Sequence, residues 1–174
     1  TAEYMHNSGK IIACDMYEHK LKLIEKGAKR LGIDIVETCL RDGSSDENPL
    51  PMADRILCDV PCSGLGVLSR KPEIRYKDDL IDTDLADIQY KILCESAKYL
   101  KKGGKLVYST CTLNPQENNK NTAKFLAEHN DFEGVELELP PELKRAFDEK
   151  PYEITLMPHT FDGDGFYIAV LTRR

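Results

Sequence analysis

Two cysteines stand out because each follows a short apolar run and precedes turn residues. Cys62 ends the stretch LCDVPC and is followed by SGLG, and Cys111 ends VYSTC and is followed by TLNPQEN. A thiolate is a strong nucleophile, but a free cysteine with a pKa of about 8.5 is only a few per cent ionised at neutral pH. A reactive cysteine therefore needs an electropositive setting or the N-terminus of a helix. Pro115 is typical of the first turn of a helix and predicts such a setting near Cys111.

A thiol of this kind could attack C6 of a cytosine, which would make C5 an enamine-like carbon nucleophile. That carbon could take a methyl group from a sulfonium donor, and a base would then remove the C5 proton so that the thiol can leave. An acidic group near N3 would help, and Asp59, two residues before Pro61, could supply it. The simpler interpretation is that each cysteine is a small residue packed at the end of a strand.

The elements that must position these residues alternate between strand-like and helix-like patterns. Helical spacing of apolar residues predicts helices at 17–31, 79–101 and 115–129. Between and after them, β-branched and apolar runs predict strands at 10–15, 33–40, 53–60, 105–111 and 135–140, with a terminal hairpin of 153–159 and 165–173. This order predicts an α/β fold with a mostly parallel sheet covered by helices, closed by an antiparallel hairpin.

Ligands of such sheets bind beyond the carboxyl ends of the strands. Asp15, Asp42 and Asp59 come at or just after predicted strand ends, as do Cys62 and Cys111, so we expect all five on one rim of the sheet. Each acid also has a structural interpretation. Asp15 could cap the helix that follows it, and Asp42 could be a turn residue before a glycine.

Composition sets limits on the class of protein. The chain has 174 residues, 41% hydrophobic and 31% charged, which is typical of one globular domain. Its net charge of -6 argues against a generally basic nucleic-acid binder, although local basic patches are compatible with it. No apolar run approaches the ~20 residues needed to span a bilayer. The first residues lack a signal-peptide pattern, so a cytoplasmic location is the default.

The six cysteines contain no CxxC pair, and the four histidines are scattered without metal-ligand spacing. We therefore expect reduced thiols and no metal site. Four of the cysteines lie inside apolar or amphipathic runs, as buried small hydrophobic residues do, namely Cys14, Cys39, Cys58 and Cys94.

Four motifs resemble those of one family. DVPCSGLGVLSRKPEIRY (59–76) resembles the first cysteine motif of RNA cytosine-5 methyltransferases, and YSTCTLNPQENN (108–119) resembles their second. CDMYEHKLKLIEKGAKRLGI (14–33) resembles the strand-end acid and helix of the bacterial RsmB (Sun) type, and LMPHTFDGDGFYIAVLTRR (156–174) its closing motif. The resemblance spans nearly the whole chain.

The resemblance implies S-adenosylmethionine-dependent methylation of C5 of a cytosine in 16S ribosomal RNA. Cys111 would be the nucleophile at C6, and Cys62 would assist product release through C5 deprotonation. Asp59 would contact the target base at the edge of the donor site. Asp15 would hold the ribose hydroxyls of the donor, and Asp42 would lie near its adenine. A strand-end acid that holds a ribose is also what dinucleotide-binding folds use.

The basic loop residues Arg70, Lys71 and Arg75 would meet phosphates of the ribosomal RNA, although they could equally form an ordinary solvated loop. A cytosine inside a helix is unreachable, so the target must be unpaired or flipped out.

In the family, a glycine-rich donor-binding motif and its strand come before the first helix of the domain. The sequence departs from this pattern, because it begins with TAEYMHNSGK, which we expect to lie inside that helix, and contains neither the motif nor the strand. We expect residues 1–174 to be a single partial catalytic domain with a Rossmann-like class I methyltransferase sheet that lacks its first strand and glycine-rich loop. We expect this piece alone to be inactive and to bind S-adenosylmethionine weakly. An exposed sheet edge could pair with a second copy and give a dimer.

Two alternatives stay open. A nicotinamide-dependent oxidoreductase on the same fold would also use strand-end acids, but it gives no account of the paired cysteine motifs. A non-catalytic binding or assembly module would keep the fold alone.

Overall fold

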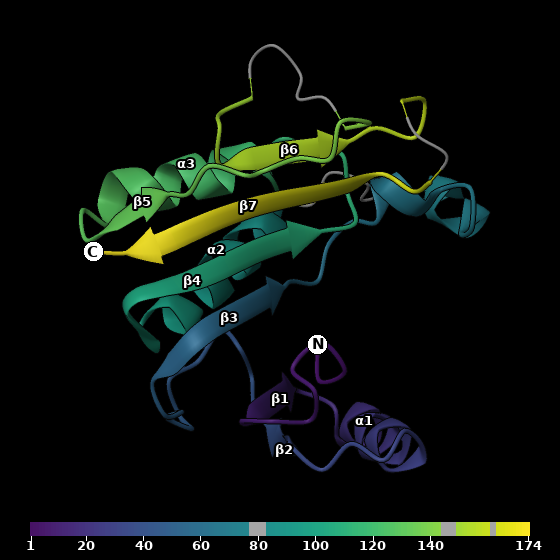
Figure 1. The fold of residues 1–174 in the computed structure, drawn as a ribbon. Helices are drawn as coiled ribbons and strands as arrows, with labels where there is room; N and C mark the ends of the chain where they lie inside the picture. Colours follow the sequence, from purple (N-terminus) through teal and green to yellow (C-terminus); the bar gives the residue numbers. More distant parts are fainter. Residues whose placement is uncertain (77–82, 144–148, 161–162) are drawn as a thin grey trace. The chain divides into compact units, whose positions relative to one another are not determined.

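The computed structural model describes residues 1–76, 83–143, 149–160 and 163–174. The chain divides into two compact units, Thr1–Pro49 and Leu50–Arg174, and each is described by itself. Figure 1 shows the helices and strands of both units.

The first unit is a β-α-β arrangement. Strand β1 (Ile11–Asp15) and strand β2 (Val36–Leu40) pair in parallel, and helix α1 (Glu18–Arg30) packs against both. Leu21 is the buried residue of the helix. Gly32 follows the helix with a φ of 67°, a left-handed conformation that glycine adopts without steric cost. The predicted strand and helix positions are confirmed here, with β2 beginning three residues later than expected.

The second unit carries the larger sheet and two helices. Its elements, in chain order, are β3 (Ala53–Asp59), the 3-10 helices η1 (Leu65–Val67) and η2 (Pro72–Tyr76), α2 (Thr83–Ala97), β4 (Leu100–Thr110), α3 (Asn119–Glu128), β5 (Phe132–Gly134), β6 (Glu153–Leu156) and β7 (Phe166–Arg173).

The sheet of the second unit has the order β3-β4-β7-β5, and β6 also pairs with β7. Strands β3 and β4 are parallel, whereas β7 is antiparallel to β4, β5 and β6. Helices α2 and α3 pack on each other and cover one face of this sheet (Figure 1). The parallel pairs and the antiparallel β6–β7 hairpin confirm the predicted α/β class.

The core of this unit lies between the sheet and the two helices. Alternate residues of β4, Leu106 and Tyr108, stand opposite Leu171 and Ala169 of β7, and all four are fully buried. Their side chains share one face because strand side chains alternate with a period of two. The core cluster also contains residues of both helices, namely Leu93, Ala97 and Phe125. The apolar periodicity of the sequence thus specifies the inner face of the sheet.

Three predicted boundaries are wrong. The helix predicted for 79–101 ends at Ala97, and residues 101–104 belong to β4; its expected start at 79–82 lies outside the described residues. Ala53 pairs with Leu100 and Arg55 with Lys105, so β4 carries extra residues there. Gly103, at a φ of 73°, permits this bulge.

The helix predicted from Pro115 begins at Asn119, because residues 115–118 form a turn, and it ends at Glu128. The strand predicted for 135–140 is also wrong, and the paired segment is β5 at 132–134. Val135 donates its N–H to the carbonyl of Val170, but the next position on β7, Ala169, already pairs with β6. The edge of β7 is therefore shared between β5 and β6, and 135–140 has no strand to pair with.

All six cysteines are free thiols, as predicted. Cys58 is buried in the core, and Cys39 and Cys94 are half-buried, but Cys14 is exposed, so its predicted burial is wrong. Within the described part of the chain, β1 pairs only with β2 and β3 only with β4. Dimerisation through such an edge stays a prediction. In the described ranges no helix is long and apolar enough to cross a membrane.

The packing of β4 gives a test of the core. Leu106 is 0% exposed, whereas Leu57 on the neighbouring strand is 66% exposed. We expect Leu106→Ala to lower the free energy of unfolding by about 2–5 kcal/mol, because it removes buried methyl groups and leaves a cavity. The matched change Leu57→Ala should cost less than about 1 kcal/mol. Urea unfolding followed by circular dichroism measures both, and equal losses would contradict this assignment of the core.

Candidate active site

The parallel pairing of β3 and β4 brings the two cysteine loops together. The last residue pair between β3 and β4 is Asp59 with Ser109, and both strands end at this edge of the sheet. Cys62 lies three residues after the end of β3, and Cys111 lies directly after Thr110, the last residue of β4. The two Sγ atoms lie 3.0 Å apart, and both residues are half-buried. The predicted proximity of these two thiols is therefore what the geometry shows.

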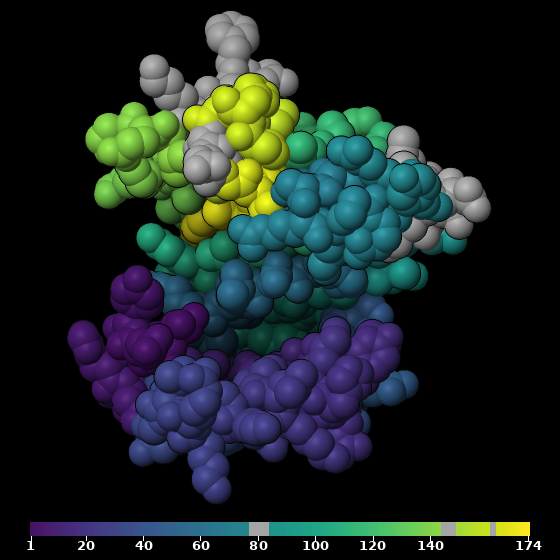
Figure 2. Space-filling view, turned by 90° about the vertical axis from the view of Figure 1, so that its right-hand side faces the viewer, coloured from purple at the N-terminus to yellow at the C-terminus, as the bar shows by residue number. Residues whose placement is uncertain are grey.

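A close backbone contact at Gly66 holds the loop of Cys62 against the loop of Cys111. The N–H of Gly66 donates to the carbonyl of Cys111 at 3.0 Å, and the N–H of Gly165 donates to the carbonyl of Gly66 at 2.7 Å. A Cβ on Gly66 would lie 2.1 Å from the oxygen of Gly165 and 2.8 Å from that of Cys111. Only glycine fits between the backbone segments of Gly165 and Cys111. Figure 2 shows the loop from residue 61 to 76 lying against the C-terminal segment.

A pocket of about 260 Å³ opens beside the two thiols. It lies over the turn of the first cysteine loop and the start of η2. Its lining consists of Cys62, Ser63, Gly64, Val67, Lys71, Glu73, Ile74 and Cys111. Both sulfur atoms thus border a space that a small planar group could enter, with one lysine among the lining residues.

The three basic residues of this loop differ in their surroundings. The guanidinium of Arg70 forms an ion pair with Asp164 at 2.8 Å, which ties the loop to the segment before β7. Lys71 lines the pocket, and Arg75 is exposed on η2. The sequence predicts a loop around these three residues, but its described part contains the short helices η1 and η2.

The two thiols are not equivalent. Burial, and after it the neighbouring Cys111 sulfur, raise the pKa of the Cys62 thiol to about 12. Cys62 therefore keeps its proton at neutral pH. Either sulfur can be the donor in the 3.0 Å contact between the two thiols. The expected helix N-terminus beside Cys111 is absent from this turn, because α3 begins eight residues later at Asn119.

Asp59 lies at the end of β3, where it was predicted, and its side chain is exposed. Its Oδ1 accepts a hydrogen bond from the hydroxyl of Ser109 at 3.1 Å. Asp59 is not among the residues that line the pocket of the two thiols. It shares their sheet edge without facing the same space.

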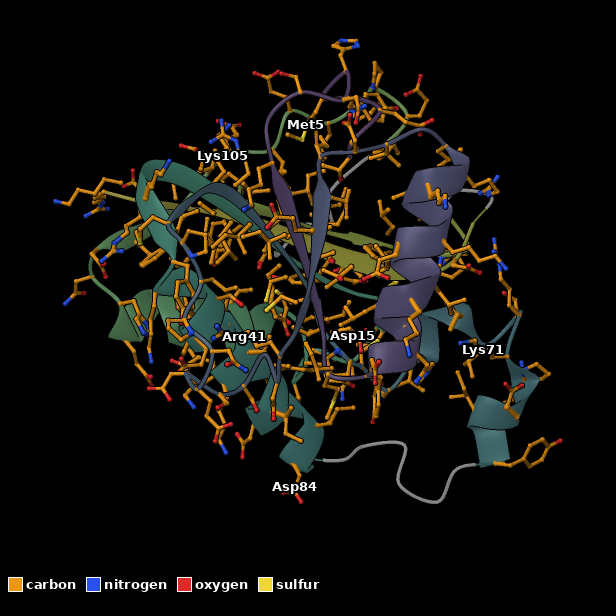
Figure 3. All side chains as sticks on the ribbon, turned by 90° about the horizontal axis from the view of Figure 1, so that it is seen from below. Met5, Asp15, Arg41, Lys71, Asp84 and Lys105 are labelled. Atoms are coloured by element: carbon orange, nitrogen blue, oxygen red, sulfur yellow. The ribbon has the colours of Figure 1, made fainter. Side chains whose placement is uncertain are left out.

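The other two acids belong to the first unit and lie together at the carboxyl end of its sheet. Arg41, which follows β2, donates its N–H to the carbonyl of Asp15 at 3.0 Å (Figure 3). The Oδ1 of Asp15 accepts the N–H of Tyr17 at 2.9 Å, just before α1. Asp42 accepts the N–H and the hydroxyl of Ser44, and these bonds lower the pKa of Asp42. Both acids thus organise turns. Asp42 is a turn residue, as its structural interpretation predicted, whereas the N-cap of α1 is Tyr17 and not Asp15.

Sequence reasoning missed a buried polar cluster behind the cysteines. Glu117 and Gln89 are 1% and 0% exposed, and they hydrogen-bond to each other at 2.8 Å. A signal for Gln89 was present, because it lies four and eight residues before Leu93 and Ala97, on the buried stripe of α2. A polar side chain on an apolar stripe indicates a buried hydrogen-bond network. In the described ranges, no group of three or more His, Cys, Asp or Glu side chains could hold a metal ion.

The fold is α/β, with a parallel strand pair that places two apposed thiols at one edge of its sheet. The comparisons with known proteins identify the family. Residues 1–172 match the model of 16S rRNA methyltransferase RsmB/F, and the chain belongs to this family. The Rossmann-like class I methyltransferase fold is confirmed with it.

Similar proteins cover almost all of this chain. It is 41% identical to the probable ribosomal RNA small subunit methyltransferase B of Bacillus subtilis, over 99% of this chain and 40% of the relative. A second such relative, from Synechocystis, is 35% identical over 99% of this chain and 39% of its own length. The crystal structure of NSun6 from Pyrococcus horikoshii with SFG superposes with a TM-score of 0.85 at 31% identity, covering 99% of this chain and 43% of that one. The chain thus spans about 40% of the length of the curated relatives it matches.

The contact at Gly66 can be tested by adding one methyl group. We expect Gly66→Ala to lower the free energy of unfolding by about 1–3 kcal/mol or more, because the neighbouring backbone must move. Gly27 lies in α1 with nothing within 4 Å of its Cβ position, so Gly27→Ala should be neutral or stabilise by up to about 1 kcal/mol. Thermal unfolding compares the two. A Gly66→Ala protein as stable as the parent would show that the two loops are not held at this point.

The raised pKa of Cys62 predicts how its reactivity depends on pH. Alkylation needs the thiolate, and a group below its pKa keeps its proton. At pH 7 we expect iodoacetamide to modify Cys62 at least ~100-fold more slowly than a free thiol of pKa about 8.5. Because Cys111 contributes to the shift, Cys111→Ala should move the alkylation profile of Cys62 to lower pH. Peptide mapping by mass spectrometry gives the rate, and half-maximal reactivity near pH 8.5 would contradict the prediction.

Proposed function

We propose that the full-length gene product transfers a methyl group from S-adenosylmethionine to C5 of a cytosine in 16S ribosomal RNA, through a covalent adduct with Cys111. Membership of the RsmB/F family supports the reaction class and the substrate. Two relatives are named as ribosomal RNA small subunit methyltransferases. The observation that carries the proposal is the 3.0 Å contact between two thiols that border one pocket.

The raised pKa of Cys62 and the family resemblance together support Cys111 as the nucleophile. Burial keeps the proton on Cys62 at neutral pH, which makes Cys62 a poor nucleophile, and the motif around Cys111 resembles the one that carries the nucleophile in the family. In the proposed reaction Cys111 loses its thiol proton to solvent, and its sulfur forms a bond to C6 of the cytosine. The electron pair of the C5–C6 double bond is then available at C5, which forms a bond to the methyl group of the donor. S-adenosylmethionine, when bound, supplies that methyl group as an electrophile.

The second half of the reaction needs a base. The C5 proton must leave before the bond between sulfur and C6 can break and restore the double bond. Once Cys111 is a neutral thioether, its contribution to the raised pKa of Cys62 disappears, so the pKa of Cys62 falls, although burial still raises it. Cys62 can then lose its own proton to solvent and accept the one from C5. This gives Cys62 the product-release role that the family resemblance implied.

Asp59 and the acids of the first unit take the remaining roles. Asp59 lies at the same sheet edge as the cysteines but outside the lining of their pocket, so we assign it to the part of the target base and of the donor site that extends beyond this pocket. Asp15 and Asp42 would hold the ribose and lie near the adenine of S-adenosylmethionine. An ionised carboxylate can accept about four hydrogen bonds. The Oδ1 of Asp15 accepts one from Tyr17 and its Oδ2 forms an ion pair with Lys20 at 3.6 Å, which leaves further lone pairs for ribose hydroxyls.

The RNA would approach over the basic loop. Lys71 lines the pocket of the thiols and is exposed, which suits contact with the phosphate of the flipped nucleotide. Arg75 is exposed nearby on η2. The side chain of Arg70 is 74% exposed although it pairs with Asp164, so it can contact a phosphate from the solvent side. All three are therefore proposed phosphate contacts, with Lys71 nearest to the reacting group.

No observation favours the nicotinamide-dependent oxidoreductase, because the family match and the paired thiols both point to methyl transfer. The non-catalytic module differs from the proposal in one respect: it forms no bond to RNA. Detection of a covalent intermediate therefore separates the two.

Single substitutions in the full-length protein test the roles. With 16S ribosomal RNA and S-adenosylmethionine, we expect Cys111→Ala to abolish both methyl transfer and the covalent adduct. Cys62→Ala should let the adduct accumulate, because the C5 proton is no longer removed. Denaturing gel electrophoresis detects the adduct, and Cys94→Ala, outside the pocket, should behave as the parent. The reverse pattern would exchange the two roles, and no adduct in any variant would favour the non-catalytic module.

A further inference from the structure

Glu117 is a buried carboxylate in the turn that follows Cys111. It is 1% exposed, and in the described part of the chain none of the ion pairs involves it. A buried charge is costly unless hydrogen bonds replace the lost water. The environment of Glu117 must therefore supply donors.

Four donors do so, two at each oxygen. The N–H of Ser63 and the Nε2 of Gln89 donate to Oε2 at 2.9 and 2.8 Å. The hydroxyl of Ser63 and the Nδ2 of Asn114 donate to Oε1 at 2.6 and 3.0 Å. An acceptor-only carboxylate matches four donors, whereas an amide of the same shape would present two N–H groups to some of them.

The carboxylate also fixes the direction of the neighbouring hydrogen bonds. Because the hydroxyl of Ser63 donates to Glu117, the hydroxyl of Thr112 must be the donor in the 2.7 Å contact between Ser63 and Thr112. The oxygen of Thr112 in turn accepts the N–H of Asn114 at 3.3 Å. The carboxylate of Glu117 thereby fixes which group donates and which accepts in each of these hydrogen bonds.

This network holds the residues on either side of both thiols. Ser63 follows Cys62, and Thr112 follows Cys111. The second N–H of Gln89 donates to the carbonyl of Pro61, which precedes Cys62, at 2.7 Å. The loop of Cys62 is thus bound before and after the thiol, and the loop of Cys111 is bound directly after it.

We propose that Glu117 is a positioning residue, whose buried carboxylate holds the two cysteine loops in the relative placement that keeps the thiols in contact. Glu117 does not line the pocket, so it acts through Ser63, Gln89 and Thr112 and not on the substrate. The claim that Glu117 holds the two loops in place rests on the hydrogen-bond network alone. Its catalytic consequence rests on the proposed methyl transfer.

The first test is Glu117→Gln in the full-length protein. The change keeps the shape but replaces one acceptor oxygen with an N–H₂ group that faces donors. We expect kcat to fall by about 10–100-fold, as for a misplacement of reacting groups by about 1 Å. The KM values for RNA and S-adenosylmethionine should stay within about threefold, because neither ligand touches Glu117.

A thiol measurement tests positioning without any methyl transfer. If the sulfur atoms separate, Cys62 loses the influence of Cys111, and its alkylation profile should move to lower pH by roughly one unit. The matched control is Glu153→Gln, because Glu153 is also buried, at 3% exposure, but bonds to the hydroxyls of Tyr167 at 2.6 Å and of Thr122 in α3 at 3.5 Å. This control should lose stability without changing the alkylation profile.

The outcomes separate the possibilities. An unchanged Cys62 profile in Glu117→Gln, or an equal shift in Glu153→Gln, would overturn the positioning role. If Glu117→Gln does not fold, Gln89→Met decides in the same way, since it removes the bonds to Glu117 and Pro61 at similar volume. If the parent protein transfers no methyl group, the proposed function fails, but the alkylation profiles still test the positioning role.

Discussion

The parallel pairing of β3 with β4 is the constraint on which the rest of the site depends. Parallel neighbours end at the same edge of a sheet, so residues 49 positions apart in the chain leave it side by side. An antiparallel pair would have placed the two thiols at opposite ends. The other contacts around Cys62 and Cys111 only adjust the distance between two loops that this pairing already brings to the same edge.

Two different forces then bring the loops from the same edge to direct contact. At Gly66 the absence of a side chain lets three backbones meet, and the gain is two hydrogen bonds between loops. Behind the thiols the carboxylate of Glu117 gathers donors from both loops and from α2. The contact at Gly66 depends on the absence of a side chain, whereas the hydrogen bonds of Glu117 depend on a carboxylate. The two therefore respond differently to substitution and to ionic conditions.

Much of this arrangement was predictable from the sequence. The strands and the cysteine loops follow from local apolar periodicity and turn residues, and these predictions are confirmed. The wrong boundaries share a physical cause, because each depends on pairing partners far away in the chain. The segment 135–140 has a strand-like pattern, but β6 occupies the edge of β7 that it would need. The residues 101–104 read as a helix end but form a bulge opposite β3.

The candidate site divides in the same way. Cysteines and strand-end acids are visible in a sequence because their types are unusual at those positions. Gln89 lies on the apolar stripe of its helix, which is a weak signal of burial, but nothing in the sequence marks Glu117 as buried, because its burial arises only when α2 covers the sheet. The asymmetry of the thiol pair is likewise tertiary. Cys62 keeps its proton because it is half-buried and lies against a second sulfur. This property of Cys62 follows from packing between two loops that are far apart in the chain, which its sequence motif alone could not reveal.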